Sequence, residues 1–191
     1  MSAGPIEAVA IAASAGAVEA LSAILPRLPA DYPLPVLVVV HVPADRRSVL
    51  ATLFQSKCRI AVREAEDKEP VVPGTVYFAP PDYHLQVEAD RTLSLSADDP
   101  VLYSRPSIDV LFESAADAYG AALAGVVLTG ANQDGARGLA AVAEAGGIAL
   151  VEEPATASAS IMPAAALEAC PAARALSLDA IAAWLLDLGE A

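Results

Sequence analysis

Hydrophobic positions along this chain alternate between strand-like runs and helix-like periods. Residues 36–40 form an uninterrupted Val/Leu run, which is typical of a strand buried on both faces of a parallel sheet. Apolar residues at helical spacing predict a helix over 18–25 that Pro26 ends, and another over 106–119 that Gly120 ends. Further strands are predicted at 9–11, 60–62, 125–128 and 148–151, and further helices at 48–54, at 139–145, around Pro163 and after Ser177.

The middle of the chain has a different pattern. Strand-like segments at 75–79, 85–87 and 92–95, with a turn at 89–90, predict antiparallel ribbons. Elsewhere strands alternate with helices, which predicts an α/β fold. We expect a three-layer αβα sandwich with a mostly parallel, doubly wound sheet and an antiparallel ribbon. Because the sequence has no internal repeat and no break in composition, residues 1–191 are predicted to form a single domain.

Composition and charge exclude several classes of protein. The chain is 55% hydrophobic and 18% charged, which argues against global disorder. Its net charge of −13 makes it a poor binder of nucleic acid or of an anionic bilayer. No apolar run approaches the roughly 20 residues of a membrane span, and no basic region precedes the apolar segment 8–17. We therefore expect neither membrane insertion nor a secretory signal.

The cysteines and histidines are few. Cys58 and Cys170 are too few for a disulfide framework and indicate a reducing compartment, so a cytoplasmic location is expected. Neither these cysteines nor His41 and His84 have the spacing of metal ligands. We expect no metal site.

Three polar residues of catalytic type follow predicted strands. They are Ser14, His41 and Asp134, and the carboxyl ends of parallel strands share one edge of a sheet. A serine hydroxyl becomes a nucleophile when an imidazole takes its proton, and a carboxylate holds that imidazole in one tautomer. Ser14 lies on a sharp strand-to-helix turn, so the N–H of Ala15 is a candidate oxyanion donor.

Each of these residues also has a simpler interpretation. Ser14 could be the N-cap of the following helix, and Asp134 with Gly135 could form only a turn. His41 could be a structural residue at a strand end, with His84 as the other candidate base. A dinucleotide-binding loop is disfavoured, because 12–16 contains one glycine instead of G-x-G-x-x-G. The G-x-S-x-G motif of the α/β-hydrolases is also absent.

Several motifs together resemble those of one known family. The sequence resembles the CheB-type chemotaxis protein-glutamate methylesterase domain from about residue 6 to residue 169. The segments that carry this resemblance are 11–16 (IAASAG), 38–43 (VVVHVP), 76–81 (VYFAPP) with His84, 104–112 (SRPSIDVLF), 128–136 (LTGANQDGA) and 161–166 (IMPAAA).

The resemblance implies a Ser14–His41–Asp134 triad and no cofactor. It implies hydrolysis of γ-glutamyl methyl esters on the cytoplasmic signalling helices of methyl-accepting chemotaxis receptors, with release of methanol, and deamidation of certain receptor glutamines. Main-chain N–H groups of Ala15 and Ala131 would form the oxyanion hole. The sequence departs from the family where that family usually has Gly, a hydroxyl residue, Gly and Met, at Ala12, Ala15, Ala17 and Ala131 respectively.

These departures keep two alternatives open. The first is an inactive receptor-binding module of the same fold, and the second is an esterase for a different methyl ester. Family members commonly carry an N-terminal receiver domain, whereas this sequence begins almost at its first strand. We therefore expect a stand-alone domain without an internal phosphorylation switch, regulated if at all by a separate protein. Among its basic residues Arg46, Arg47 and Arg105, the first two follow His41. They either steer an acidic receptor helix or are ordinary solvated charges.

Overall fold

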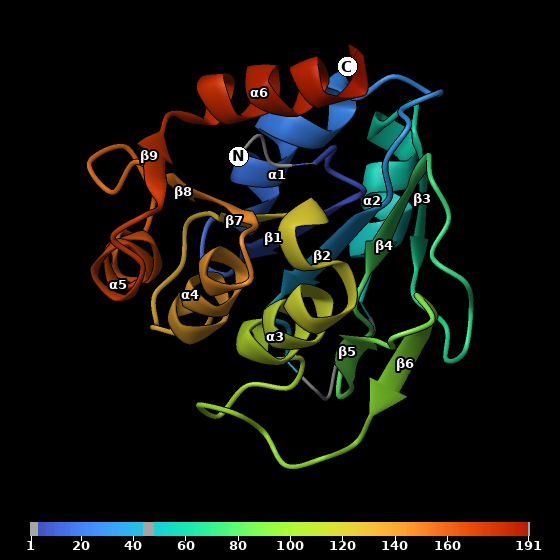
Figure 1. Ribbon diagram of the computed structural model, residues 1–191, viewed down its shortest axis with the longest axis horizontal. Helices are drawn as coiled ribbons and strands as arrows, with labels where there is room; N and C mark the ends of the chain where they lie inside the picture. The colour runs from blue at the N-terminus through green and yellow to red at the C-terminus, as the bar shows by residue number, and fades with distance from the viewer. Residues whose placement is uncertain (1–3, 44–47, 191) are drawn as a thin grey trace.

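A parallel sheet forms the centre of the structure, which is a computed structural model that describes residues 4–43 and 48–190 (Figure 1). Within these residues the sheet has seven strands in the order β3-β4-β2-β1-β7-β8-β9, and every neighbouring pair is parallel. The strands are β1 (Ala8–Ala13), β2 (Val36–Val40), β3 (Ala61–Glu64), β4 (Thr75–Phe78), β7 (Leu123–Val127), β8 (Ile148–Glu152) and β9 (Arg174–Leu176).

Helices cover both faces of the sheet, which confirms the predicted three-layer α/β arrangement (Figure 1). Alternate strand residues point to opposite faces, so Val9 and Ile11 pack toward one helical layer while Ala10 and Ala12 pack toward the other. One layer contains α1 (Ala17–Ile24), α2 (Leu50–Lys57) and α6 (Leu178–Glu190), and the other contains α3 (Ile108–Tyr119), α4 (Ala136–Glu144) and α5 (Ile161–Ala169).

The predicted helical faces are the buried ones. In α3 the apolar residues at helical spacing are buried, among them Leu111 and Phe112. The predicted cap of α6 is also present, since the Ala180 N–H donates to Ser177 Oγ at 3.2 Å. Short 3₁₀ turns follow α1 at Leu25–Arg27 and α3 at Gly120–Ala122.

One predicted strand lies in a different sheet from the one that its sequence indicates. Residues 75–79 were expected in an antiparallel ribbon, but β4 lies inside the parallel sheet between β2 and β3. All four residues of β4 are buried, as an interior parallel strand requires, although Thr75 and Tyr77 make its sequence look alternating. The antiparallel ribbon consists of β5 (His84–Val87) and β6 (Leu93–Ser96) and packs against α3.

The order in which successive strands are added to the sheet reverses at β1, which has β2 on one side and β7 on the other. In such sheets ligands bind at the carboxyl ends of the strands on either side of this point. The loops that leave these strands are tied together, because Ser14 N–H donates to Thr129 O at 2.9 Å and His41 N–H donates to Ala13 O at 3.3 Å. The three loops with the candidate residues therefore meet at one edge.

None of the helices in 4–43 and 48–190 has the length and apolar character needed to cross a bilayer. Within the same ranges no three His, Cys, Asp or Glu side chains are grouped as metal ligands would be.

Candidate active site

Ser14 lies on a tight turn between β1 and α1. Its alternative interpretation as a helix cap is wrong, because Gly16 is the N-cap of α1 and no side chain caps that end. Gly16 has φ of +83°, and a Cβ there would lie 2.7 Å from the Cβ of Ser158. Only glycine fits this turn, which leaves the Ser14 hydroxyl free to face His41.

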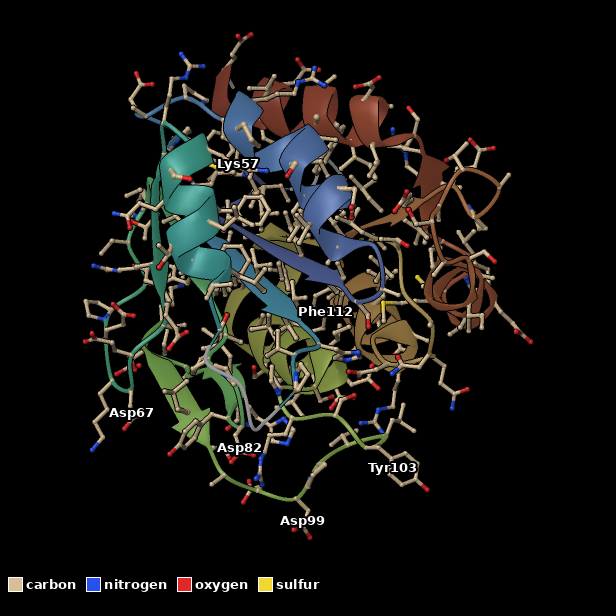
Figure 2. The ribbon with its side chains drawn as sticks, turned by 180° about the vertical axis from the view of Figure 1, so that it is seen from behind. Lys57, Asp67, Asp82, Asp99, Tyr103 and Phe112 are labelled. Atoms are coloured by element: carbon tan, nitrogen blue, oxygen red, sulfur yellow. The ribbon has the colours of Figure 1, made fainter. Side chains whose placement is uncertain are left out.

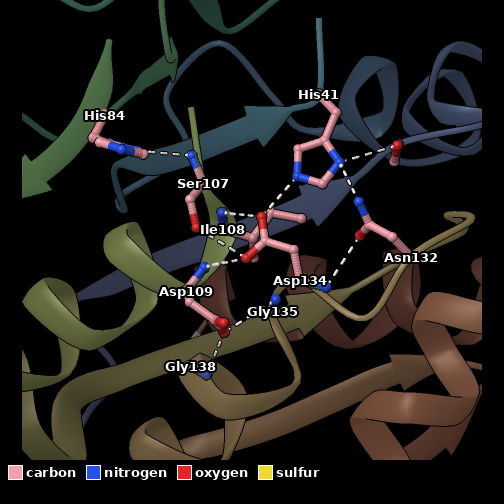
Figure 3. Close-up of polar contacts among 10 residues, drawn as sticks. His41, His84, Ser107, Ile108, Asp109, Asn132, Asp134, Gly135 and Gly138 are labelled. Atoms are coloured by element: carbon pink, nitrogen blue, oxygen red, sulfur yellow. Dashed lines mark hydrogen bonds and ion pairs between the residues drawn. The ribbon is translucent and has the colours of Figure 1, made fainter. Parts of the chain in front are cut away.

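His41 connects the serine to the aspartate (Figure 3). Its Nδ1 lies 3.2 Å from Ser14 Oγ, and its Nε2 lies 2.7 Å from Asp134 Oδ2. Since Nε2 faces a carboxylate, this nitrogen carries the proton of the neutral ring, and Nδ1 is left as an acceptor for the serine hydroxyl. The ring is 12% exposed, so solvent reaches one side of it.

Asp134 is fully buried and lies at the N-terminus of α3. Its Oδ2 accepts the Ile108 N–H at 2.7 Å, and its Oδ1 accepts the Asp109 N–H at 3.0 Å and the Ser107 Oγ–H at 2.9 Å. Burial by itself would raise the pKa of this carboxyl, but the hydrogen bonds from His41 and from the two N–H groups outweigh it and hold the pKa below its ordinary value. Asp134 is therefore an anion at neutral pH.

Asp109 makes the reciprocal contact from α3 to α4. Its Oδ1 accepts the N–H of Gly135 at 3.0 Å and the N–H of Gly138 at 2.7 Å, at the start of α4. Burial raises the pKa of this second carboxyl, and the nearby Asp134 raises it further against the Gly138 hydrogen bond. The simpler interpretation of 134–135 as only a turn is thus insufficient, because this turn brings two helix ends and two carboxylates together.

Asn132 was not singled out by sequence reasoning, although it lies within the family motif at 128–136. Its Oδ1 accepts the Asp134 N–H at 3.0 Å, and its Nδ2 lies 3.5 Å from His41 Nδ1. A polar residue two positions before an aspartate is a common turn signal, and the contact with the histidine could not be inferred from it.

Thr129 and Glu152 support the turn that carries Ser14. The Thr129 hydroxyl donates to Ala15 O at 2.8 Å, and the Thr129 N–H donates to Glu152 Oε2 at 2.8 Å. Burial raises the pKa of the Glu152 carboxyl, while the Thr129 hydrogen bond lowers it. Ala15 and Ala131 are exposed at the surface, and neither N–H donates a hydrogen bond to another residue in the described part of the chain.

His84 does not contact Ser14 and belongs to the support of the site. It is 2% exposed, its Nδ1 accepts the Ser107 N–H at 3.1 Å, and its Nε2 donates to Asp99 O at 3.0 Å. Arg105 is likewise a structural residue that binds Asp82 and the carbonyls of residues 97 and 98. Arg46 and Arg47 lie outside the described residues, so steering by them stays a prediction.

A hollow of about 390 Å³ opens beside His41, and its lining also includes Tyr103 and Arg105. Tyr103 is fully exposed on a tight turn over 101–104, and Figure 2 shows its ring pointing away from the body of the molecule. Asp82 and Asp99 lie at the same end of the molecule as Tyr103 (Figure 2). The hollow there is lined by His41 and Asp82 and opens to solvent, so a substrate can reach the imidazole.

Comparisons with known proteins agree on one family. Residues 9–185 match the family model described as CheB methylesterase. A Leptospira interrogans protein provisionally named protein-glutamate methylesterase/protein-glutamine glutaminase is 45% identical over 184 residues, which is 96% of this chain and 95% of that protein. A Caulobacter vibrioides protein-glutamate methylesterase/protein-glutamine glutaminase is 40% identical over 187 residues, and the chain spans 54% of its length.

A solved structure agrees in fold. The crystal structure of the Thermotoga maritima CheB methylesterase catalytic domain superposes with a TM-score of 0.90 at 33% identity. The match covers 97% of this chain and 100% of that domain.

Proposed function

Because this chain belongs to the CheB methylesterase family, a family of carboxylic ester hydrolases, we propose that it hydrolyses γ-glutamyl methyl esters on methyl-accepting chemotaxis receptors. The observation that carries the proposal is the continuous chain of contacts from Ser14 through His41 to Asp134. Each contact has the donor and acceptor order that a serine esterase needs.

The first half of the reaction is acyl transfer to the serine. His41 Nδ1 takes the Ser14 proton as the hydroxyl oxygen attacks the ester carbonyl, and a tetrahedral intermediate forms. The imidazolium is stabilised by Asp134, which stays ionised because α3 and His41 hold its pKa low. The proton on Nδ1 then passes to the departing methoxide, and methanol leaves as the serine ester forms.

The negative charge on the intermediate needs fixed donors. We assign this task to the main-chain N–H groups of Ala15 and Ala131. Both residues are exposed, Ala15 directly follows Ser14, and the Thr129 hydroxyl holds the Ala15 carbonyl in place. Their methyl side chains do not alter this role, because the donor is the backbone.

The second half of the reaction releases the glutamate. Water enters from the open side of His41, gives a proton to Nδ1 and attacks the serine ester, and the proton returns to the Ser14 oxygen as the carboxylate leaves. A receptor glutamine would follow the same path with ammonia as the first product. No step in this scheme needs a cofactor.

The partner of this site is the cytoplasmic signalling helix region of a receptor, and we place the protein in the cytoplasm with it. We take residues 1–191 as one catalytic domain. Methanol release from a methylated receptor signalling domain tests this function directly.

An inactive receptor-binding module remains the second candidate, because alanine replaces the usual residues next to Ser14. A fluorophosphonate probe separates the two candidates. Labelling of Ser14 that Ser14→Ala abolishes supports the enzyme, and no labelling under conditions that label a control hydrolase supports the module. An ester panel then tests for a different methyl ester.

A further inference from the structure

His84 is buried against the same carboxylate network without touching the reacting atoms. It opens β5, its Nδ1 contacts the Ser107 N–H (Figure 3), and its Nε2 contacts the carbonyl of Asp99. Nε2 faces the Asp99 carbonyl, so it carries the proton and donates. Nδ1 faces the Ser107 N–H, so it is an acceptor. The hydrogen bonds therefore define a neutral ring in a single tautomer.

Ser107 links this ring to Asp134. Its N–H goes to His84 at 3.1 Å, and its hydroxyl goes to Asp134 Oδ1 at 2.9 Å. The next two N–H groups, of Ile108 and Asp109, go to the same carboxylate. Ser107 is fully buried and is the N-cap of α3, yet its side chain does not cap its own helix. The orientation of the backbone at Ser107 thus sets the direction of the three groups that donate to Asp134, which are the Ser107 hydroxyl and the N–H groups of Ile108 and Asp109.

Resting on the proposed function, we propose that His84 is a positioning residue for ester hydrolysis. By accepting the Ser107 N–H, it keeps the donors of 107–109 aimed at Asp134, and Asp134 in turn holds His41 toward Ser14. Without an acceptor at Nδ1, a buried N–H loses its partner, and the segment must rotate to find another. The carboxylate would then lose the geometry that orients the imidazole.

The alternative role for His84 is purely structural, as a tether for the loop at Asp99. Two amide substitutions separate the roles, because each keeps one of the ring nitrogens. In His84→Asn the amide oxygen replaces Nδ1 and still accepts from Ser107. In His84→Gln the amide nitrogen replaces Nε2 and still donates to Asp99 O, but the acceptor at Nδ1 is lost.

Steady-state kinetics on the methylated receptor domain give the first readout. His84→Asn should retain kcat within about threefold, whereas His84→Gln should lose about tenfold to a hundredfold in kcat with little change in KM. The reverse order, or equal kcat in both variants, would overturn the proposal. Thermal unfolding of both variants checks folding, and should His84→Gln not fold, His84→Ala takes its place, because it also removes the acceptor at Nδ1 and should lower kcat with KM unchanged.

A second readout does not depend on turnover. The ring proton on His41 Nε2, hydrogen-bonded to Asp134, should give a downfield NMR signal that persists in His84→Asn and is lost or shifted in His84→Gln. Identical signals in the two variants would reject the positioning role even if the wild type is active. Failure of the proposed function would instead show as absent turnover in the wild type, with the His41 signal still reporting on His84.

Discussion

Asp134 and Asp109 cap each other's helices. The Asp134 carboxylate accepts the first N–H groups of α3, and the Asp109 carboxylate in α3 accepts N–H groups at the start of α4. Helix N-termini favour negative charge, which helps to hold the pKa of Asp134 below its ordinary value, whereas burial outweighs this effect at Asp109 and raises the pKa of that carboxyl. The carboxylate that faces His41 is therefore held by the N-terminus of α3, and Asp109 ties that helix to the start of α4.

Replacing Asp134 should reduce the pH dependence of the free energy of unfolding. Asp134→Asn should lower the free energy of unfolding at pH 7 by about 1–3 kcal/mol, because an amide nitrogen would face a buried N–H. The folded-state pKa of Asp134 lies below the unfolded value, so the wild-type advantage is complete above about pH 4. That advantage disappears as the pH falls through the folded-state pKa.

Urea unfolding from pH 7 downward measures this difference. Asp31→Asn, at an exposed position, is the control and should change stability by less than about 0.5 kcal/mol. A gap between wild type and Asp134→Asn that widens toward low pH would contradict the assignment.

Gly138 permits the close contact of α3 and α4. A Cβ there would lie 2.7 Å from the Cβ of Phe112 and 3.0 Å from the Cα of Asp109. Gly138→Ala should therefore lower the free energy of unfolding by about 1–3 kcal/mol, although alanine is the better helix former. Gly4→Ala, with nothing within 4 Å, is the control. Denaturant unfolding of both variants measures the change in the free energy of unfolding, and a Gly138→Ala protein more stable than the wild type would refute the packing argument.

Tyr103 should contact the receptor and not the ester. It is fully exposed and lines the same hollow as His41. Tyr103→Ala should raise KM for the methylated receptor domain by about tenfold and leave kcat/KM for a small ester such as p-nitrophenyl acetate unchanged. Tyr83→Ala is the control, since Tyr83 is exposed but does not line this hollow. Equal effects on both substrates would argue against a docking role.

The sequence predicted the fold and the three candidate residues for a shared reason. Each buried strand ends where the hydrophobic run gives way to polar residues. Because the carboxyl ends of parallel strands lie at one edge of the sheet, the polar residues that follow them are brought together there. The pattern could not reveal the supporting contacts, because Ser107, Asn132 and Glu152 act on residues that only strand order brings near. The same lack of tertiary context explains the misplaced β4 and the missed β9, a short edge strand that is mostly exposed.

The central claim is that the Ser14 hydroxyl is the nucleophile. Methanol release from a methylated receptor signalling domain should be measured for wild type, for Ser14→Ala and for Ser158→Ala, which removes a neighbouring exposed hydroxyl. We expect release by the wild type and by Ser158→Ala, and release at the uncatalysed rate by a Ser14→Ala protein with an unchanged melting temperature. Methanol release by Ser14→Ala near the wild-type rate would contradict the account.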